Sequence, residues 1–314
     1  MTVATSYPDR LGHECEVVPG FAETVFSGSA SGAGSGYRQT AASLTSVEAT
    51  AAHLLAVRSR VALGVRLMNT LAPESEGHAT LVIGAGAGEE CFWLADQSRG
   101  RAEVVGVNLK AEIPFHDSCP GAAARAAGEE AADRAIARMH LRVDDICDSG
   151  LGAAQFDRIF SWQTFEHVMD LERAFGHVAR VLRPGGAAFI EYNPFFSIDG
   201  AHWPATIDIP WAHARMTPEV FAEAVAALHP SPRPDAASFV ERAINRATQS
   251  EILAIVARSG LRVAAHLPRV RTEDTLVLDR RIFEAVRAGF PSVTALDLTS
   301  RIVRLVLTKP GEAS

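Results

Sequence analysis

The chain has 314 residues, and 47% of them are hydrophobic, so it is long and apolar enough to bury a full core and is not globally disordered. Its formal net charge is −7, with 30 basic against 37 acidic residues and no basic tract, which argues against nucleic acid as a partner. The sequence shows neither a signal-peptide pattern nor an apolar run near the roughly 20 residues of a membrane span, so we expect a cytoplasmic protein without a membrane partner.

Two features precede the first strand. Residues 26–36 consist of serine, glycine and alanine after Phe26, a composition typical of a flexible linker. Residues 43–71 carry apolar side chains at helical spacing and predict one long helix. Such a helix serves for packing or for association, so a homodimer stays an open alternative.

Residues 80–88 join an apolar strand to three alternating glycines, Gly84, Gly86 and Gly88, and a helix follows. Glycine has no Cβ, so the backbone can turn sharply there and a ligand can lie against it. Doubly wound α/β folds hold nucleotide-like cofactors at such a turn, and the two candidates are a dinucleotide and S-adenosylmethionine. Glu89 stands at the helix start, where a pyrophosphate would have to bind. The spacing therefore favours the phosphate-free, positively charged S-adenosylmethionine.

The next two strands end on side chains suited to a nucleoside. Residues 103–109 read as a strand, and Asn108 near its end stands where a ribose diol needs a hydrogen-bond partner. Residues 141–146 read as a third strand, and its terminal acid, Asp145, can accept a hydrogen bond from the adenine amino group.

The remaining strands complete a sheet. Residues 156–162 predict a fourth strand, and the helix after it ends at the Arg-Pro-Gly-Gly turn of residues 183–186. Residues 187–192 predict a fifth strand. Residues 261–267 and 301–308 predict two more near the C-terminus.

The order and spacing of these segments resemble the class I S-adenosylmethionine-dependent methyltransferases over roughly residues 78–192 and again at the C-terminus. The matching stretches are residues 82–88, 105–109, 144–146, 156–161, 165–170 and 181–186. Val82 and Asn108 depart from the family pattern, which commonly has acids at both places. The resemblance implies an α/β fold, namely a Rossmann-like, seven-stranded, mostly parallel sheet with a C-terminal antiparallel hairpin. It implies S-adenosyl-L-methionine as cofactor, bound by Gly84, Ala85, Gly86, Gly88, Asn108, Leu109, Asp145, Ile146, Ser161 and Trp162.

This interpretation divides the chain into four parts. Residues 1–75 are a flexible segment and a helical cap, and the resemblance suggests that the helix roofs the cofactor site. Residues 76–192 form the cofactor-binding core, and residues 248–314 form the C-terminal part of its sheet. Residues 193–247 are a long insertion after the fifth strand, with a helix at 218–228. Insertions of this length are usually functional, and we predict that this one is a substrate lid.

Histidines and aromatic residues are the candidates for the acceptor side. One histidine follows the fourth strand, near where the methyl group should project, and two more accompany two tryptophans in the insertion. Such residues can line a pocket for an aromatic acceptor and supply a base at neutral pH. The alternative is a lid that only packs its own aromatic residues on the core. We predict catalytic roles for His167, His202 and His213, and substrate contacts for Tyr192, Trp203 and Trp211.

Residues 163–167 also resemble the Glu-x-x-Glu-His pattern that holds a divalent metal in the ubiquinone-pathway O-methyltransferases. Gln163 replaces the first carboxylate here, which weakens the binding of a hard cation such as Mg²⁺. We therefore predict no metal site.

Together these features predict methyl transfer from S-adenosylmethionine, by in-line displacement, to an oxygen or nitrogen of a small-molecule acceptor of the secondary-metabolite kind. A C-methyltransferase of the same fold, a nicotinamide-dependent oxidoreductase and a non-catalytic scaffold are the alternatives. Glu89 and the C-terminal hairpin argue against the oxidoreductase, whereas Val82 and Asn108 leave room for the scaffold.

Overall fold

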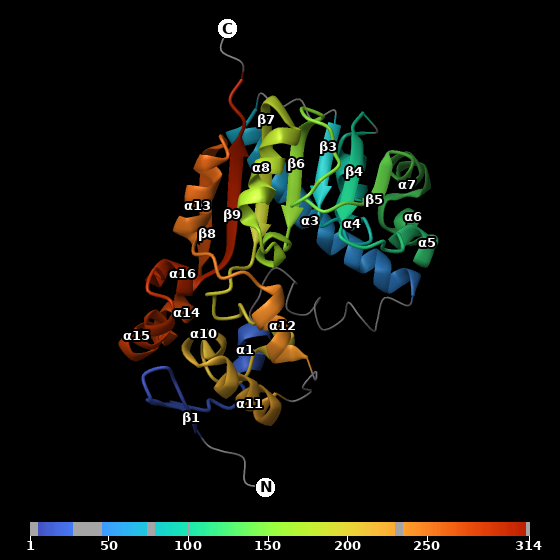
Figure 1. The fold of residues 1–314 in the computed structure, drawn as a ribbon. Coiled ribbons are helices and arrows are strands. Elements are labelled where there is room, and N and C mark those ends of the chain that lie inside the picture. The colour runs from blue at the N-terminus through green and yellow to red at the C-terminus, as the bar shows by residue number, and fades with distance from the viewer. Residues whose placement is uncertain (1–5, 28–45, 74–78, 100, 230–234, 312–314) are drawn as a thin grey trace.

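The computed structural model describes residues 6–27, 46–73, 79–99, 101–229 and 235–311. At its centre lies a seven-stranded sheet in the order β5-β4-β3-β6-β7-β9-β8 (Figure 1). Strands β3 to β7 run parallel, and β9 pairs antiparallel with both β7 and β8, which confirms the predicted sheet and its hairpin. The strands are β3 (Ala79–Ile83), β4 (Glu103–Asn108), β5 (Met139–Val143), β6 (Phe156–Trp162), β7 (Leu182–Tyr192), β8 (Arg262–Val270) and β9 (Ser300–Thr308).

The strand order reverses direction at β3. From β3 the chain moves to β4 and β5 on one side, and then returns to β6 and β7 on the other. In open α/β sheets the crevice outside the carboxyl ends of the strands at such a reversal is the ligand-binding position. The topology therefore places the turn after β3 at the expected site.

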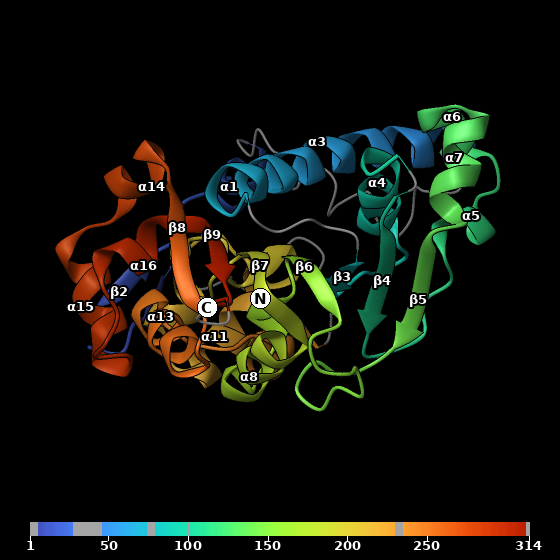
Figure 2. The same cartoon turned by 90° about the horizontal axis from the view of Figure 1, so that it is seen from above.

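Helices cover both faces of the sheet. On one face α3 runs from the β9 side across β7 to α6 (Figure 2), and α4 packs beside it. On the other face α8 and α13 pack together against β7 and β8. These helices are α3 (Val47–Leu71), α4 (Glu89–Gln97), α5 (Phe115–Ser118), α6 (Ala122–Ala127), α7 (Glu129–Ile136), α8 (Leu171–Val181) and α13 (Gln249–Arg258).

Local chemistry sets several of these boundaries. α3 begins after Ser46, whose hydroxyl accepts a hydrogen bond from the Ala49 amide at 3.1 Å. α13 begins with a capping box in which Thr248 and Glu251 satisfy each other's backbone amides. The Arg-Pro-Gly-Gly segment ends α8 as predicted, but it belongs to β7 as a bulge. The pairing with β6 jumps from Leu182 to Ala187 across it, so β7 begins earlier than the predicted strand.

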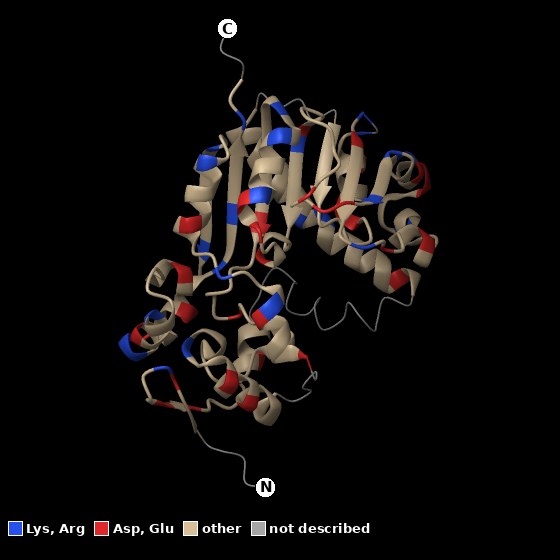
Figure 3. Ribbon diagram, in the orientation of Figure 1, with Lys and Arg blue, Asp and Glu red and all other residues tan. Residues whose placement is uncertain are grey.

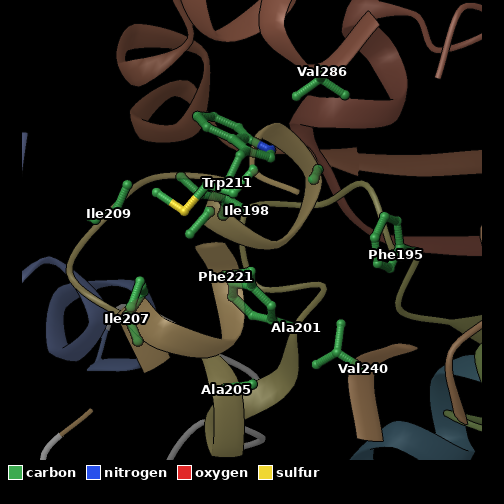
Figure 4. Packing of buried hydrophobic residues seen from close by; sticks show 14 of the residues in the cluster. Phe195, Ile198, Ala201, Ala205, Ile207, Ile209, Trp211, Phe221, Val240 and Val286 are labelled. Carbon is green, nitrogen blue, oxygen red and sulfur yellow. The ribbon is translucent and has the colours of Figure 1, made fainter. Parts of the chain in front are cut away.

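A second layer, which we call the cap, lies beyond the carboxyl ends of the parallel strands (Figure 1). It combines three stretches, residues 6–27, residues 193–229 with 235–247, and residues 271–299, around one hydrophobic cluster that is separate from the two clusters of the sheet. Figure 4 shows Trp211, Ile198 and Phe221 at its centre, with Val286 reaching in from the third stretch. Its elements are β1 (Ser6–Pro8), β2 (Glu14–Glu16), α1 (Phe21–Ser27), α9 (His202–Ala205), α10 (Ala212–Arg215), α11 (Pro218–Leu228), α12 (Ala236–Ala243), α14 (Thr272–Val277), α15 (Arg280–Gly289) and α16 (Ala295–Thr299), with a short turn, η1 (Phe165–His167), between sheet and cap.

Polar contacts join the three stretches of the cap to one another and to the sheet. The carboxylate of Asp208 accepts hydrogen bonds from the amides of Gly20 and Ala22 at 3.0 and 2.9 Å. Arg301, the second residue of β9, donates two hydrogen bonds of 2.6 Å to Asp274 and one of 2.5 Å to the Val25 carbonyl. One guanidinium therefore ties the sheet to two stretches of the cap.

Most of the predicted linker at 26–36 lies outside the described residues, as do residues 230–234 of the insertion. Among the described helices, none combines the length and apolarity that crossing a membrane requires. In the view of Figure 3, Lys and Arg are scattered among Asp and Glu over both layers without forming a basic stripe.

Candidate active site

The turn after β3 is built from three glycines in the left-handed region, with φ of +74° at Gly84, +53° at Gly86 and +98° at Gly88. A Cβ on Gly84 would lie 2.0 Å from the hydroxyl of Thr164, and one on Gly88 would lie 2.9 Å from Met139. A Cβ on Gly86 would meet nothing closer than a Glu89 carboxylate oxygen at 4.0 Å. Two of the glycines are therefore needed for packing, whereas Gly86 leaves open space in front of the turn.

The end of β4 fastens this turn to the sheet. The side-chain amide of Asn108 accepts a hydrogen bond from the Gly86 amide and donates one to the Gly86 carbonyl, both at 2.8 Å. Asn108 therefore already holds the turn in the free protein, and its oxygen keeps a second lone pair for a ribose hydroxyl. Leu109, the next residue, is 69% exposed. An exposed leucine beside a nucleoside position can cover one face of an adenine ring.

The end of β5 supplies acids and a second apolar side chain. Asp145 is exposed and accepts a hydrogen bond from the Cys147 amide at 2.8 Å, while Ile146 is buried in the sheet core. Val143 is 56% exposed, at the strand end beside β4. Sequence reasoning did not single out Asp144, yet one oxygen of its carboxylate is buried without a hydrogen-bond partner among the described residues. Buried polar atoms of this kind usually find a partner, so this oxygen is available to a ligand.

The end of β6 lies between the glycine turn and the acceptor side. The Ser161 hydroxyl donates to the Ile83 carbonyl at 2.9 Å and is fully buried, so it ties β6 to β3. The Trp162 indole stacks on Phe160 with ring centroids 5.3 Å apart and lies under Gly64 of α3. Ser161 thus shapes the wall beneath the site by packing, whereas the buried indole N–H of Trp162 has no hydrogen-bond partner among the described residues.

An ionic contact fixes α3 to the cofactor side. Arg60 of α3 pairs with Glu90 at the start of α4 and donates to the side-chain oxygen of Gln163 at 3.2 Å. Gln163 has a left-handed backbone, with φ of +50°, at the point where β6 ends. Strained positions of this kind cluster at functional sites. Beside this contact, burial and then the neighbouring Glu90 raise the pKa of Glu89 to about 7.

Three side chains meet at η1, namely two of the predicted histidines and one acid beside them. Glu166, His167 and His202 each offer one ligand atom, and these atoms lie within 4.8 Å of one another. The rings of His167 and His202 stack with centroids 5.2 Å apart, although His202 comes from α9 in the cap. Glu166 was not among the predicted site residues. Neither of its carboxylate oxygens has a hydrogen bond of standard geometry within the described part of the chain.

Burial controls the charge of this group. It raises the pKa of Glu166 to about 8, against smaller lowering effects of backbone amides, and it lowers the pKa of His202 to about 3. Burial also lowers the pKa of His167, although the Ala243 carbonyl opposes the shift. Both imidazoles are therefore neutral near pH 7.

The end of α12 holds η1 in place. Asn245 donates from its side-chain amide to the carbonyls of Phe165 and Val168, at 2.7 and 2.9 Å, and its backbone amide donates to the Glu166 carbonyl at 2.8 Å. The Nδ1 of His167 lies 2.7 Å from the Ala243 carbonyl. Sequence reasoning missed Asn245, because its partners lie about 80 residues away in the chain.

The other predicted acceptor-side residues lie within packed regions. His213 is buried against Phe195, with its Nε2 2.7 Å from the Phe195 carbonyl, and burial lowers its pKa to about 4. Trp211 donates its indole N–H to the Phe196 carbonyl at 3.0 Å and is 1% exposed in the cap core. The structure thus joins His202 to His167, and it places His213 and Trp211 inside the cap.

The two remaining predicted residues, Trp203 and Tyr192, are aromatic and packed. Trp203 packs edge-on against Phe26 and His229, with centroids 5.3 and 5.6 Å apart. Tyr192 is 3% exposed in the sheet core, and burial raises the pKa of its hydroxyl. Both side chains carry structural contacts in the free protein.

These residues fit a sulfonium nucleoside better than a diphosphate. The turn offers open space at Gly86 and exposed apolar side chains at two neighbouring strand ends. The helix start that would have to receive a phosphate carries two carboxylates, Glu89 and Glu90, and the nearby cation Arg60 is paired with the second. S-adenosylmethionine brings no phosphate and carries a positive sulfur.

Comparison with known proteins finds a methyltransferase domain in the segment that contains the glycine turn. Residues 81–190 match the family described as "Methyltransferase domain". A curated relative, the methyltransferase GfsG of Streptomyces halstedii, is 34% identical over 116 residues, which are 36% of each chain. The aligned part thus spans only about a third of that relative.

Two solved structures are similar in overall shape. One is phosphoethanolamine N-methyltransferase 2 of Haemonchus contortus in complex with S-adenosyl-L-methionine. It has 18% identity and a TM-score of 0.46, over 79% of this chain and 52% of that one. The other is geranyl diphosphate C-methyltransferase from Streptomyces coelicolor A3(2), with 15% identity and a TM-score of 0.44 over 79% of this chain and 80% of that one.

Proposed function

Because residues 81–190 form a methyltransferase domain of the class I, S-adenosylmethionine-dependent kind, we propose that the protein transfers the methyl group of S-adenosylmethionine to a small-molecule acceptor. We propose oxygen or nitrogen as the atom methylated and a secondary-metabolite-like compound as the acceptor. The observation that carries the proposal is the open space at Gly86, in a turn whose Gly84 lies against Thr164, the residue before η1.

The strand ends bind the cofactor. The backbone at Gly86 approaches the nucleoside, Asn108 meets the ribose, and Asp145 receives the adenine amino group between Leu109 and Val143. Arg60 holds α3 over this side through Glu90 and Gln163. Ser161 and Trp162 support the floor.

The cap binds the acceptor. Residues 193–229 and 235–247, together with residues 6–27 and 271–299, share one core and cover the carboxyl edge of the sheet. Thr164 connects the two halves, because its hydroxyl lies against Gly84 and its carbonyl accepts from the His167 amide at 2.8 Å. The group of Glu166, His167 and His202 at η1 therefore lies next to the glycine turn, where it can contact the reacting atom.

Methyl transfer demands mainly alignment of the acceptor with the methyl carbon. A lone pair of the acceptor forms the new bond to carbon, and the carbon–sulfur electron pair returns to sulfur, which becomes a neutral thioether. An acceptor hydroxyl or ammonium must also lose a proton. The neutral imidazoles of His167 and His202 can accept the hydrogen bond from that group.

Isothermal titration calorimetry tests the cofactor assignment. S-adenosylmethionine and S-adenosylhomocysteine should bind in the micromolar range, and NADH should not bind. The Gly86→Ala variant should lose about 100-fold in affinity, since its methyl group enters the ligand space. Gly260→Ala is the matched control, because Gly260 has φ of +84° and open surroundings after α13. Tight NADH binding, or equal affinities of the two variants, contradicts the proposal.

A further inference from the structure

The group at η1 has the composition of a metal site. Glu166, His167 and His202 place a carboxylate oxygen and two imidazole nitrogens within 4.8 Å of one another. In the part of the chain that the structure describes, no other cluster of three His, Cys, Asp or Glu side chains meets this criterion. The ligands come from both layers, since Glu166 and His167 follow β6 and His202 begins α9 in the cap.

Glu166 is the first independent indication of a bound cation. The residue is 1% exposed, and both of its carboxylate oxygens are buried without a standard hydrogen bond among the described residues. The neighbouring acid, Glu191, is paired with Arg304 at 2.7 Å, so that arginine is already engaged. A buried carboxylate is strongly unfavourable unless it takes up a proton, is paired or coordinates a metal. A cation between Glu166 and the two histidines would supply that partner.

The orientation of His167 is the second indication. Its Nδ1 lies 2.7 Å from the Ala243 carbonyl, which can only accept, so Nδ1 carries the proton and donates it. The lone pair is then on Nε2. Histidines that bind metals almost always donate a hydrogen bond from their other ring N–H to a carbonyl, carboxylate or water. Asn245 fixes the backbone of the same turn, so the ring is held from two directions.

His202 completes the group from the cap. Its backbone has φ of +56°, which is unusual for a non-glycine residue and recurs at functional sites. Its ring stacks on His167, and Phe239 packs edge-on against it with centroids 6.2 Å apart. Apolar packing of this kind limits the access of water to a site.

We propose that Glu166, His167 and His202 bind one divalent metal of the Zn²⁺ class, with an open position for an acceptor hydroxyl. Two imidazoles and one carboxylate favour Zn²⁺ and similar ions over Mg²⁺, which prefers oxygen ligands. Three protein ligands with one open position is also the arrangement of catalytic zinc sites. Zinc bonds of about 2.0–2.2 Å require the three atoms to move closer together, which side-chain rotation allows.

The role of the metal rests on the proposed methyl transfer. Two neutral imidazoles and one carboxylate leave a Zn²⁺ ion with one uncompensated positive charge. Because the ion would hold the imidazole lone pairs, an acceptor hydroxyl on the open position would neutralise this charge by losing its proton to bulk water as it enters the site, and its oxygen would be a nucleophile at neutral pH. This inference selects a hydroxyl acceptor over an amine or a carbon. It departs from the sequence prediction of no metal, which considered only the ligands near Gln163.

Metal binding is tested on the full-length protein after treatment with a chelator, independently of methyl transfer. Titration with Zn²⁺ by calorimetry should show one ion per chain with micromolar or tighter affinity, and Co²⁺ should give visible absorption bands of an ordered site. The His202→Ala variant should bind at least about 100-fold more weakly. His140→Ala, which changes an exposed histidine paired with Glu103, should bind like the wild type.

Glu166→Gln is a second test variant, which keeps the proposal testable if His202→Ala fails to fold. It replaces a buried carboxyl group by an amide of the same size, so the metal-free variant should unfold at or above the wild-type temperature and should lose metal affinity. Absence of stoichiometric Zn²⁺ and Co²⁺ binding by the wild type, or wild-type affinity in both variants, overturns the proposal. Calorimetry with S-adenosylhomocysteine on the same samples separates the two claims, since failure there contradicts the methyltransferase proposal and leaves the metal result standing.

Discussion

The two halves of the candidate site are built in different ways. On the cofactor side, the candidate residues end a strand or lie in the turn that follows it, and hydrogen bonds join one strand end to the next turn, as Asn108 does with Gly86. On the acceptor side, the cap brings together residues from three stretches, and Arg10 contacts a carbonyl 204 positions away. A sheet edge thus positions a site through the local order of the chain, whereas a cap positions a site through tertiary contacts.

The two halves also differ in what stabilises them. The glycine turn depends on backbone conformations that exclude side chains at Gly84 and Gly88. The cap depends on its apolar core and on Arg301, which is 6% exposed and pairs with Asp274, itself 2% exposed. Asp199 lies 3.9 Å from the same guanidinium. Substitutions in the two halves should therefore fail for different physical reasons.

The largest effect is expected from Arg301→Ala. The substitution leaves Asp274 buried without its partner and removes the donor to the Val25 carbonyl. Breaking a buried ion pair in this manner costs about 3–5 kcal/mol. Chemical denaturation should show that loss in the free energy of unfolding. Arg280→Ala, which removes an exposed pair with Glu284, is the control and should change stability by less than about 1 kcal/mol. A small effect of Arg301→Ala would show that the apolar core alone holds the cap.

Gly84→Ala should have the next largest effect, about 2–3 kcal/mol. The left-handed backbone accounts for about 1–2 kcal/mol of this, and the clash with the Thr164 hydroxyl accounts for the rest. Gly12→Ala is the matched change in the cap, because Gly12 has φ of +80° and no atom within 4 Å. Thermal unfolding should separate the two variants. Equal losses would mean that contact with Thr164 does not constrain the turn.

The same division explains what the sequence could predict. Parallel strands that end at or shortly before Gly84, Asn108 and Asp145 follow from apolar runs and turn residues, because strand ends of one sheet meet at one edge. Gly86 and Glu89 further indicated the class of cofactor from their own chemistry. The sheet, its hairpin and the turn at which we propose that the cofactor binds were therefore predictable from local patterns.

The acceptor side was predictable only in part. His167 and His202 were chosen for their residue type, but no local pattern in the sequence indicates that the two side chains meet. Their contact depends on how α9 docks on η1, and on Asn245, whose partners are remote in the chain. The place of residues 6–27 and 271–299 in the cap was not predictable for the same reason, since apolar side chains alone do not identify which surface they cover.

Arg60→Ala tests whether the helix that crosses the sheet face contributes to the cofactor side. The variant loses the ion pair with Glu90 and the hydrogen bond to Gln163, so α3 is less firmly held. Affinity for S-adenosylhomocysteine should fall by about tenfold, which corresponds to one charged hydrogen bond. Calorimetry with Arg66→Ala, an exposed arginine on the same helix, supplies the control. If both variants bind alike, α3 serves packing only.

The smallest effect is expected from Glu89→Gln and depends on pH. The pKa of Glu89, about 7, exceeds its ordinary value of 4.5, so the folded state binds the proton more tightly than the unfolded state. The stability that this proton confers is fully present below about pH 4.5 and is lost as the pH rises toward 7. Glutamine does not titrate, so at pH 8 the variant should be more stable by on the order of 1 kcal/mol, and the difference should vanish near pH 4.

Saturating S-adenosylmethionine makes the same variant informative about the cofactor side. An ionised Glu89 beside a positive sulfonium gains a favourable interaction that glutamine cannot offer. The advantage of Glu89→Gln at pH 8 should therefore shrink when the cofactor is bound, whereas S-adenosylhomocysteine, with its neutral sulfur, should reduce it less. Thermal unfolding at pH 4 and pH 8, with and without each ligand, measures these differences. An advantage that is unchanged by S-adenosylmethionine would place Glu89 outside the field of the sulfonium and would assign its raised pKa to burial and Glu90 alone.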